Sequence, residues 1–245
     1  MDELTALIAD NSRQKPDNYV LLIDEIGRGD TAEIFGELIT LIEADKRAGA
    51  RNAMSVILPL SGEAFEVPAN LYLIGTLNAA DGCRGLADKR LRRRFEFEEL
   101  MPDASYIRGD DQLGTISDQN GNRIDLRALM GSINRRIDFL LGRENMLGHA
   151  FFMHIRSFDG LLRAMHHQII PQLCEIFAGD WSRVQLIFKD VLGDGLPNHP
   201  QIVAHETQSF ANIFGVDRKE ICDQVRYWIT PEHAMTPQAL RKVYQ

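Results

Sequence analysis

Two short segments of the chain are almost entirely apolar, and polar residues follow each of them. Residues 19–24 are YVLLID, and residues 71–77, LYLIGTL, are followed by Asn78. A continuous apolar run of this length is typical of a strand that is buried on both faces of a parallel sheet. The pattern therefore predicts two buried parallel strands with polar side chains at their carboxyl ends.

The first hundred residues contain further helix and strand patterns. Residues 31–46 place apolar side chains at helical spacing, so we expect a helix directly after the first strand. Residues 54–67 contain two β-rich runs on either side of Ser61 and Gly62, which predicts a hairpin. Residues 92–100, RRRFEFEEL, predict a third strand centred on the two Phe residues.

Beyond Pro102 the strand pattern fades and helical patterns take its place. Residues 104–124 are polar and rich in Gly and Asp, which indicates a linker or a long loop. Helices are expected over three ranges: 125–141, 158–178 and 180–192. The chain therefore divides into an α/β part, residues 1–102, and a mostly helical part, residues 103–245.

Composition excludes several classes of protein. Lys and Arg total 27 against 35 for Asp and Glu, so the net charge of -8 gives no overall attraction to nucleic acid or to anionic membranes. The three Cys residues are far apart in the sequence, which argues against a disulfide framework and a zinc site. No segment resembles a signal peptide or approaches the roughly 18 apolar residues of a membrane span. We therefore expect a cytoplasmic protein that does not bind membranes.

Acidic and amide side chains follow the two predicted strands. Asp24 and Glu25 end the first strand, and Asn78 and Asp81 follow the second. Ligands of open parallel sheets bind outside the carboxyl ends of the strands, so these side chains share one site if the strands are neighbours. Such a set suits nucleotide hydrolysis, in which an Asp holds hydrated Mg²⁺, a Glu polarises water and an Asn orients it. A strand that ends in an acidic surface loop is the simpler interpretation of the first segment alone.

The order of the motifs resembles the AAA+ nucleotide hydrolases, specifically the McrB-type branch of the dynein-related and MoxR-like group. The matching segments are YVLLIDEIGRGD as Walker B, FGELITLIEADKR as its helix, VILPLSGEAFEVPANLYLIGTLNAAD as a hairpin with the sensor-1 strand, LADKRLRRRFEFEEL, LGRENMLGHAFFM and IIPQLCEIFAGDWSRVQLIF. The resemblance implies a partial AAA+ P-loop NTPase core of the α/β class, with a parallel sheet, flanking helices and a β-hairpin insertion. A mostly α-helical lid is expected to follow this core.

The resemblance also implies roles for the residues at the strand ends. Asp24 corresponds to the Mg²⁺ ligand, Glu25 to the catalytic base and Asn78 to the first sensor. Arg28 and Asp81 belong to neighbouring elements that contribute to nucleotide binding. The implied cofactors are Mg²⁺ and either ATP or GTP, and nothing in the sequence selects between the two nucleotides.

Cationic residues complete the site that the resemblance implies. Arg92, Arg93 and Arg94 occupy the place of an arginine finger, which reaches into the next subunit's site and stabilises charge on the transferring phosphoryl group. Three consecutive arginines are also typical of a solvated face or a nucleic-acid patch. Arg143 and His149 lie where the helical lid approaches nucleotide, although a lone His is more often a structural residue.

The sequence departs from the family pattern in three ways. Gly27 stands where the pattern has Asn, and Gly82 stands where an Arg is common. The phosphate-binding loop, G-x-x-x-x-G-K-[ST], does not occur in the 245 residues. Truncation or splitting of a longer gene explains its absence while the other site residues remain, and degeneration is the alternative. In either case we expect no hydrolysis by this chain alone.

The sequence therefore predicts the C-terminal portion of a McrB-like motor that hydrolyses ATP or GTP in a homo-oligomeric ring. By resemblance, the ring drives a McrC-like nuclease subunit and meets DNA only through that partner or through a separate N-terminal module. A non-catalytic assembly or regulatory subunit is the alternative. A nucleic-acid-binding module that uses residues 89–94 is disfavoured by the acidic total charge.

Overall fold

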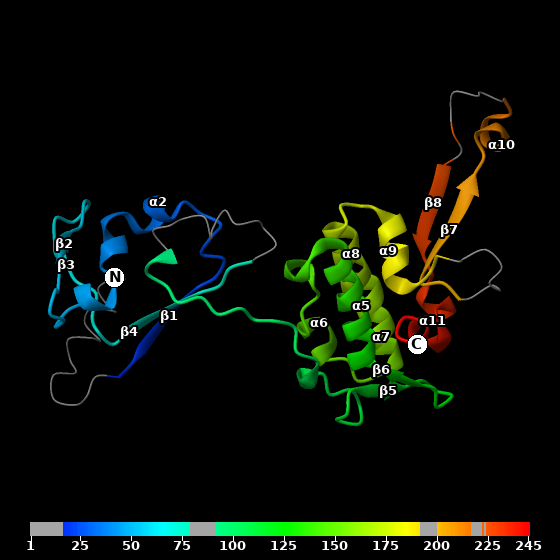
Figure 1. Cartoon of the computed structure of the whole chain (residues 1–245), viewed down its shortest axis with the longest axis horizontal. Coiled ribbons are helices and arrows are strands. Elements are labelled where there is room, and N and C mark those ends of the chain that lie inside the picture. Colours follow the sequence, from blue (N-terminus) through cyan, green and yellow to red (C-terminus); the bar gives the residue numbers. More distant parts are fainter. Residues whose placement is uncertain (1–16, 79–91, 192–199, 217–221, 223) are drawn as a thin grey trace. The chain divides into compact units, whose positions relative to one another are not determined.

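The computed structural model describes residues 17–78, 92–191, 200–216, 222 and 224–245 (Figure 1). The chain divides between Glu99 and Leu100 into two compact units, each with its own internal packing. Within the described ranges, every helix is too short or too polar to cross a membrane.

The first unit is built on a pair of parallel strands. Its elements are β1 (Tyr19–Ile23), α2 (Thr31–Phe35), η1 (Gly36–Thr40), η2 (Ala44–Lys46), β2 (Val56–Ile57), β3 (Ala64–Phe65) and β4 (Leu71–Gly75). Strands β1 and β4 pair in parallel with Ile23 opposite Gly75, while β2 and β3 form an antiparallel hairpin. The predictions of two parallel strands and of an inserted hairpin are confirmed, and the two strands are neighbours, which was the condition for a shared site. The carboxyl ends of β1 and β4 therefore meet at one edge.

The helix after β1 is shorter than predicted. Only Thr31–Phe35 is α-helical, and the chain continues in 3-10 turns. Gly36 has a φ of +47°, outside the α-helical region, so a regular helix cannot run through it. Helical spacing of apolar side chains therefore predicted the helix correctly but not its length.

The predicted third strand at residues 92–100 is wrong. Arg92 is helical rather than extended, and residues 95–100 form no β-ladder with any described segment. An apolar-polar alternation favours a strand only where a neighbouring backbone offers hydrogen-bond partners. No such neighbour exists in the described part of this unit.

The β1–β4 sheet is less covered than the apolar runs predicted. Five of its side chains keep 48–63% of their surface exposed: Val20, Leu21, Leu22, Tyr72 and Ile74. The buried apolar residues of this unit lie instead in the connections around the sheet: Ile26, Leu41, Ile42 and Val67. An apolar run therefore specified the strands, whereas their burial depends on covering elements that the described residues do not provide.

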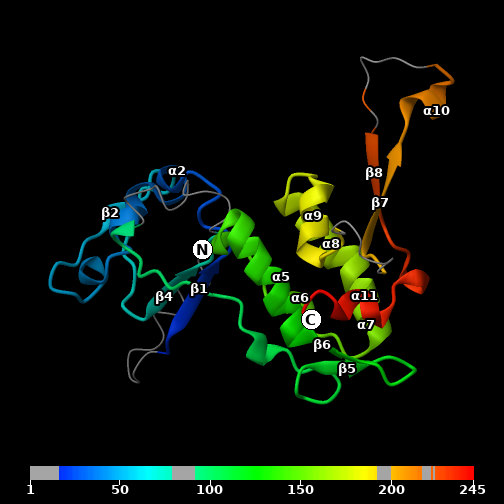
Figure 2. The same cartoon turned by 45° about the vertical axis from the view of Figure 1, so that its right-hand side comes forward.

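The second unit is mostly helical and contains most of the buried core. Its elements are η4 (Ala104–Tyr106), β5 (Thr115–Ser117), β6 (Arg123–Asp125), α5 (Leu126–Leu141), η5 (Arg143–Asn145), α6 (Ala150–Met153), α7 (Phe158–Ala164), η6 (Met165–Ile169), α8 (Ile170–Ile176), α9 (Trp181–Phe188), β7 (Val203–Gln208), α10 (Phe210–Phe214), β8 (Gln224–Ile229), η7 (Glu232–Ala234) and α11 (Pro237–Arg241). The three predicted helices are confirmed, with α7, the π-helical η6 and α8 forming the middle one, but the last helix ends at Phe188, short of its predicted end. Helix α5 lies against α9 in both views (Figures 1 and 2).

Side-chain caps explain where the lid helices begin. The carboxylate of Asp125 accepts the N–H of Ala128 at the start of α5, and Asp180 accepts two N–H groups at the start of α9. These bonds satisfy donors that have no partner within the helix. One face of α5 then places Leu129, Ile133 and Ile137 in the core, where all three are fully buried.

Two hairpins in this unit were missed. Residues 104–124 are not a plain linker, because β5 and β6 pair there and bury Ile116 and Ile124 completely. Strands β7 and β8 form a second hairpin that extends away from the helices, with α10 at its far end (Figures 1 and 2). Most of β7 is polar, its middle residues are exposed, and only Val203 at its base is buried. A strand that buries so little gives no apolar pattern to detect.

Candidate functional site

Thr76 joins the carboxyl ends of β1 and β4. Its backbone N–H donates to the carbonyl of Ile23 at 3.0 Å, and its carbonyl accepts the N–H of Ile26 at 3.0 Å. Its hydroxyl oxygen accepts the N–H of Glu25 at 2.8 Å and donates to Asp24 Oδ1. Both acidic residues are therefore tied to the end of the neighbouring strand.

Gly75 permits this close arrangement. A Cβ atom at this position would lie 3.0 Å from Cγ2 of Ile26, which is closer than ordinary contacts allow. Ile26 is the buried apolar residue that follows the acidic pair. The Gly thus lets the chain after β1 turn over the end of β4.

Glu25 occupies an unusual backbone conformation. Its φ is +51°, in the left-handed region that residues other than Gly seldom adopt. Its carboxylate forms an ion pair with Arg28, with Nη1 and Oε2 2.8 Å apart, and 45% of its side chain is exposed. The base proposed from the sequence is thus accessible to water and is held in a tight turn.

The remaining strand-end residues are placed in part. Asn78 follows Thr76 by two positions, is exposed and lies within the described residues. Asp81 lies outside them. The structure therefore brings Asp24 and Glu25 together with the segment that leads to Asn78.

The three consecutive arginines have different surroundings. Arg94 forms an ion pair with Glu43 of the same unit, with Nη2 and Oε1 2.9 Å apart, and only 16% of its side chain is exposed. Arg92 and Arg93 are exposed. Arg94 therefore has an internal partner, and its low exposure distinguishes it from the other two.

The two lid residues also differ from each other. The ring of His149 stacks on Tyr106 with centroids 5.0 Å apart, and its Nδ1 accepts the N–H of Asp103 at 3.1 Å. These contacts give His149 a structural role at the start of the second unit. Arg143 is exposed in η5.

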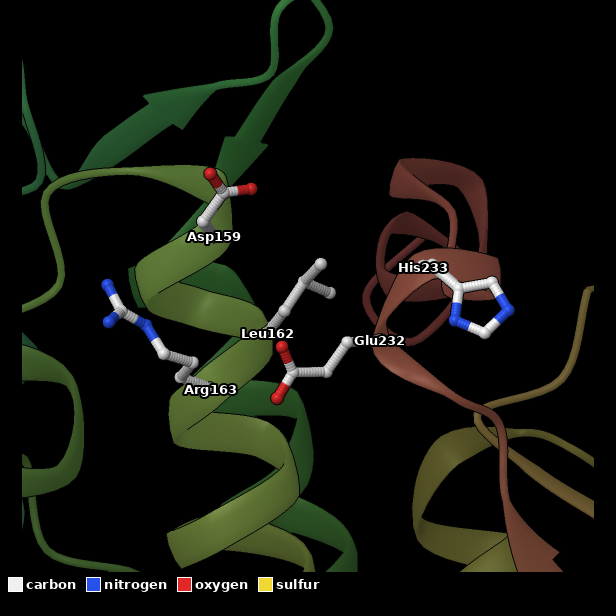
Figure 3. Close-up of a pocket in the computed structure, with 5 residues that line it drawn as sticks. All are labelled: Asp159, Leu162, Arg163, Glu232 and His233. Atoms are coloured by element: carbon white, nitrogen blue, oxygen red, sulfur yellow. The ribbon is translucent and has the colours of Figure 1, made fainter.

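A shallow pocket of about 420 Å³ lies between α7 and η7. It is lined by Asp159, Leu162, Arg163, Glu232 and His233. Figure 3 shows Arg163 and His233 pointing to opposite sides rather than toward a common centre. Within the described ranges, no three His, Cys, Asp or Glu side chains are grouped to hold a metal ion. The pocket lacks the convergent polar groups of an organised ligand site.

Thr76 was not identified from the sequence. In the sequence, Thr76 is only a hydroxyl residue between an apolar strand and Asn78. Its contacts with Asp24 and Glu25 depend on the pairing of β1 with β4. Among the described residues, the strand ends offer the chemistry that Mg²⁺ prefers, because the carboxylate of Asp24 supplies hard oxygen atoms and Thr76 holds that carboxylate in place. Mg²⁺ keeps several waters and needs only one or two carboxylates besides phosphate, so a larger acidic cluster is not required.

Comparison with known proteins agrees with this architecture. Residues 125–185 match the family "McrB, alpha-helical lid domain". The chain is 30% identical over 194 residues to the Type IV methyl-directed restriction enzyme EcoKMcrB subunit of Escherichia coli (strain K12), an alignment that covers 75% of this chain. It is 24% identical over 147 residues, or 55% of its length, to the Type II restriction enzyme BsuMI component YdiS of Bacillus subtilis (strain 168).

A partial α/β core followed by a helical lid of this type defines the class as AAA+. The chain belongs to the McrB-type AAA+ proteins. It spans 42% of the length of each of the two relatives.

Proposed function

We propose that this chain is the Walker B-to-lid portion of a McrB-like motor that hydrolyses ATP or GTP with Mg²⁺. The observation that supports the proposal is the Thr76 joint, which holds Asp24 and Glu25 at the carboxyl ends of two paired parallel strands. In open parallel sheets, this edge is where ligands bind. Residues 1–102 would supply the α/β subdomain and residues 103–245 the lid.

Asp24 is suited to hold hydrated Mg²⁺. Its Oδ1 accepts the Thr76 hydroxyl, and its Oδ2 has no hydrogen-bond partner in the described part of the chain. One carboxylate oxygen is therefore fixed while the other remains available to a ligand. When bound, the ion would neutralise charge that develops on the phosphates.

Glu25 and Asn78 would act on the attacking water. The half-exposed carboxylate of Glu25 can accept a proton from a water molecule, and the amide of Asn78 can orient that water. Arg28 forms an ion pair with the Glu25 carboxylate. During hydrolysis this carboxylate would interact with both Arg28 and the attacking water. By resemblance to the family, Asp81 and Arg143 are further candidates for nucleotide binding. His149 is also a candidate by resemblance, but its ring is already engaged by Tyr106 and by the N–H of Asp103.

Ring assembly and partners form the second part of the proposal. The exposed Arg92 and Arg93 suit a finger that acts on the neighbouring subunit of a homo-oligomeric ring. Both relatives carry restriction-enzyme names, which supports a role in a restriction system. A McrC-like nuclease subunit would then be the partner that the ring drives, with DNA bound indirectly.

Glu25→Gln tests the proposed chemistry. The substitution keeps the shape of the side chain and removes its ability to take a proton, so kcat should fall by about 10²-fold or more. Phosphate release is measured for the full chain joined to a McrB-family segment that carries a phosphate-binding loop. Asp45→Asn, at an exposed carboxylate outside the strand-end site, is the matched control and should leave the rate unchanged.

Two outcomes would contradict the proposal. An unchanged rate in Glu25→Gln would remove Glu25 as the base. An assembled ring that shows no turnover with wild-type Glu25 would instead support the non-catalytic regulatory subunit.

A further inference from the structure

The geometry points to Thr76 as a positioning residue for both carboxylates of the proposed hydrolytic site. This inference rests on the proposed function, since it concerns the same site. Thr76 would not touch nucleotide or water. It would act by fixing the Asp24 carboxylate and the Glu25 backbone through its hydroxyl group.

One hydroxyl group makes both contacts. It can donate a single hydrogen and accept others at the same oxygen. In this structure the hydrogen goes to Asp24 Oδ1, and the oxygen accepts the N–H of Glu25 at 2.8 Å. A Val side chain has nearly the same shape as Thr but can make neither contact.

The contact with Asp24 selects one orientation of its carboxylate. With Oδ1 engaged by Thr76, Oδ2 is the oxygen that remains available in the described part of the chain. Thr is itself restricted in χ1 by its branched Cβ, so the donor is held in place before any ligand binds. Loss of the hydroxyl would leave the Asp24 side chain free to rotate.

The contact with Glu25 supports a strained turn. A residue other than Gly at a φ of +51° persists only where its surroundings hold it there. The next N–H along the chain, that of Ile26, donates to the backbone carbonyl of Thr76 at 3.0 Å. The amides of Glu25 and Ile26 are therefore both hydrogen-bonded to Thr76. Only the first of these two bonds depends on the Thr76 side chain.

The two bonds can be separated by substitution, which distinguishes a role of the Thr76 hydroxyl from a general effect on the packing of the strand ends. Thr76→Val removes the acceptor of the Glu25 amide but keeps the backbone acceptor of the Ile26 amide. Thr76→Ser keeps both acceptors. The backbone bond from the Thr76 N–H to Ile23 is retained in all three proteins.

Amide hydrogen exchange on the full chain tests the positioning directly. In Thr76→Val we expect the Glu25 amide to exchange about tenfold faster relative to the Ile26 amide, because it has lost its hydrogen bond. Thr76→Ser should match the wild type at both amides. Equal acceleration of both amides in Thr76→Val, or no acceleration of either, would overturn the inference.

Turnover of the chain joined to a phosphate-binding segment tests the consequence. Thr76→Val should lower kcat by about tenfold and raise the Mg²⁺ concentration needed for half-maximal rate, with the nucleotide KM little changed. Thr76→Ser should restore both values. A purely structural role would not shift the Mg²⁺ dependence selectively.

The two proposals fail in different ways. If Glu25→Gln leaves the rate unchanged, the proposed function fails, whatever Thr76 does. If Glu25→Gln stops turnover while Thr76→Val retains wild-type kcat and Mg²⁺ dependence, only the inference about Thr76 is overturned.

Discussion

In an assembled ring, replacing the finger residue with Ala, at either Arg92 or Arg93, is expected to slow nucleotide hydrolysis by about 10³-fold. The reason is that a guanidinium acting in trans stabilises charge in the transition state. The same change at Arg94 should have a much smaller effect on the chemistry. Arg94 is ion-paired with Glu43 and mostly buried, whereas Arg92 and Arg93 are exposed. A finger must project from its own subunit, so the Glu43 contact argues against Arg94.

Subunit mixing tests whether the arginine acts in trans. A ring made only of the finger variant and a ring made only of Glu25→Gln should both be slow. Mixed rings should regain activity, because some interfaces then combine an intact Glu25 from one subunit with an intact finger from the next. Arg92→Lys is the matched variant: it keeps the charge but loses the planar, multi-donor geometry of a guanidinium.

The outcome also distinguishes the finger from the simpler interpretation of three arginines. Wild-type rates for the Arg92 and Arg93 variants would mean that these side chains form a solvated face. Slow rings that mixing does not rescue would place the arginine's effect within its own subunit. For Arg94→Ala we expect a loss of stability of about 1 kcal/mol in the first unit, discounted for the partial exposure of Glu43.

The sequence correctly placed the acidic pair at the carboxyl ends of two parallel strands. Apolar runs located β1 and β4, and the two strands pair in parallel as expected, although their side chains are less buried than the runs predicted. The hydrophobic pattern was therefore sufficient to assign Asp24 and Glu25 to one edge of the sheet. Thr76 could not be assigned in this way, because its two contacts depend on register and on the left-handed turn at Glu25.

Other features escaped prediction for related physical reasons. Strand β7 of hairpin β7–β8 is mostly polar, so hydrophobic periodicity does not reveal it. Residues 92–100 carry a strand-like alternation, but no described backbone pairs with them. The lid helices were predicted well because α5 combines a capping Asp with regularly spaced core residues.

The largest stability effect is expected at a buried ion pair in the second unit. Asp190 is completely buried, accepts the N–H groups of Ile202 and Val203, and forms an ion pair with Lys242. Lys242 also donates to the carbonyl of Pro200. The pair connects the end of α9 to the base of β7 and to the C-terminal segment.

Lys242→Met should therefore destabilise the second unit by about 3–5 kcal/mol at neutral pH, because it leaves a buried carboxylate without its cation. The loss corresponds to roughly 10 °C in Tm for a unit of this size. Arg183→Met is the matched control, since Arg183 pairs with Asp180 on the surface of the same unit. That substitution should cost less than about 1 kcal/mol.

The pH dependence of this loss identifies its cause. Burial raises the pKa of Asp190, and Lys242 opposes that rise, so removing Lys242 should raise the pKa further. A carboxyl group whose pKa is raised by folding binds its proton more tightly in the folded state. The stabilisation that results is complete below the unfolded pKa of about 3.9 and is lost as the pH rises through the pKa of the folded state.

The difference in unfolding free energy between wild type and Lys242→Met should consequently shrink as pH falls from 8 toward 4, because protonated Asp190 no longer needs a cation. Asp111 behaves in the opposite sense, since hydrogen bonds from Thr115 lower the pKa of its carboxyl group to about 2. It is present in both proteins, however, and cancels in the difference. Thermal melts of the two proteins at pH 4.5 and pH 8 measure this difference, and an equal deficit at both values would exclude the buried Asp190 charge as its origin.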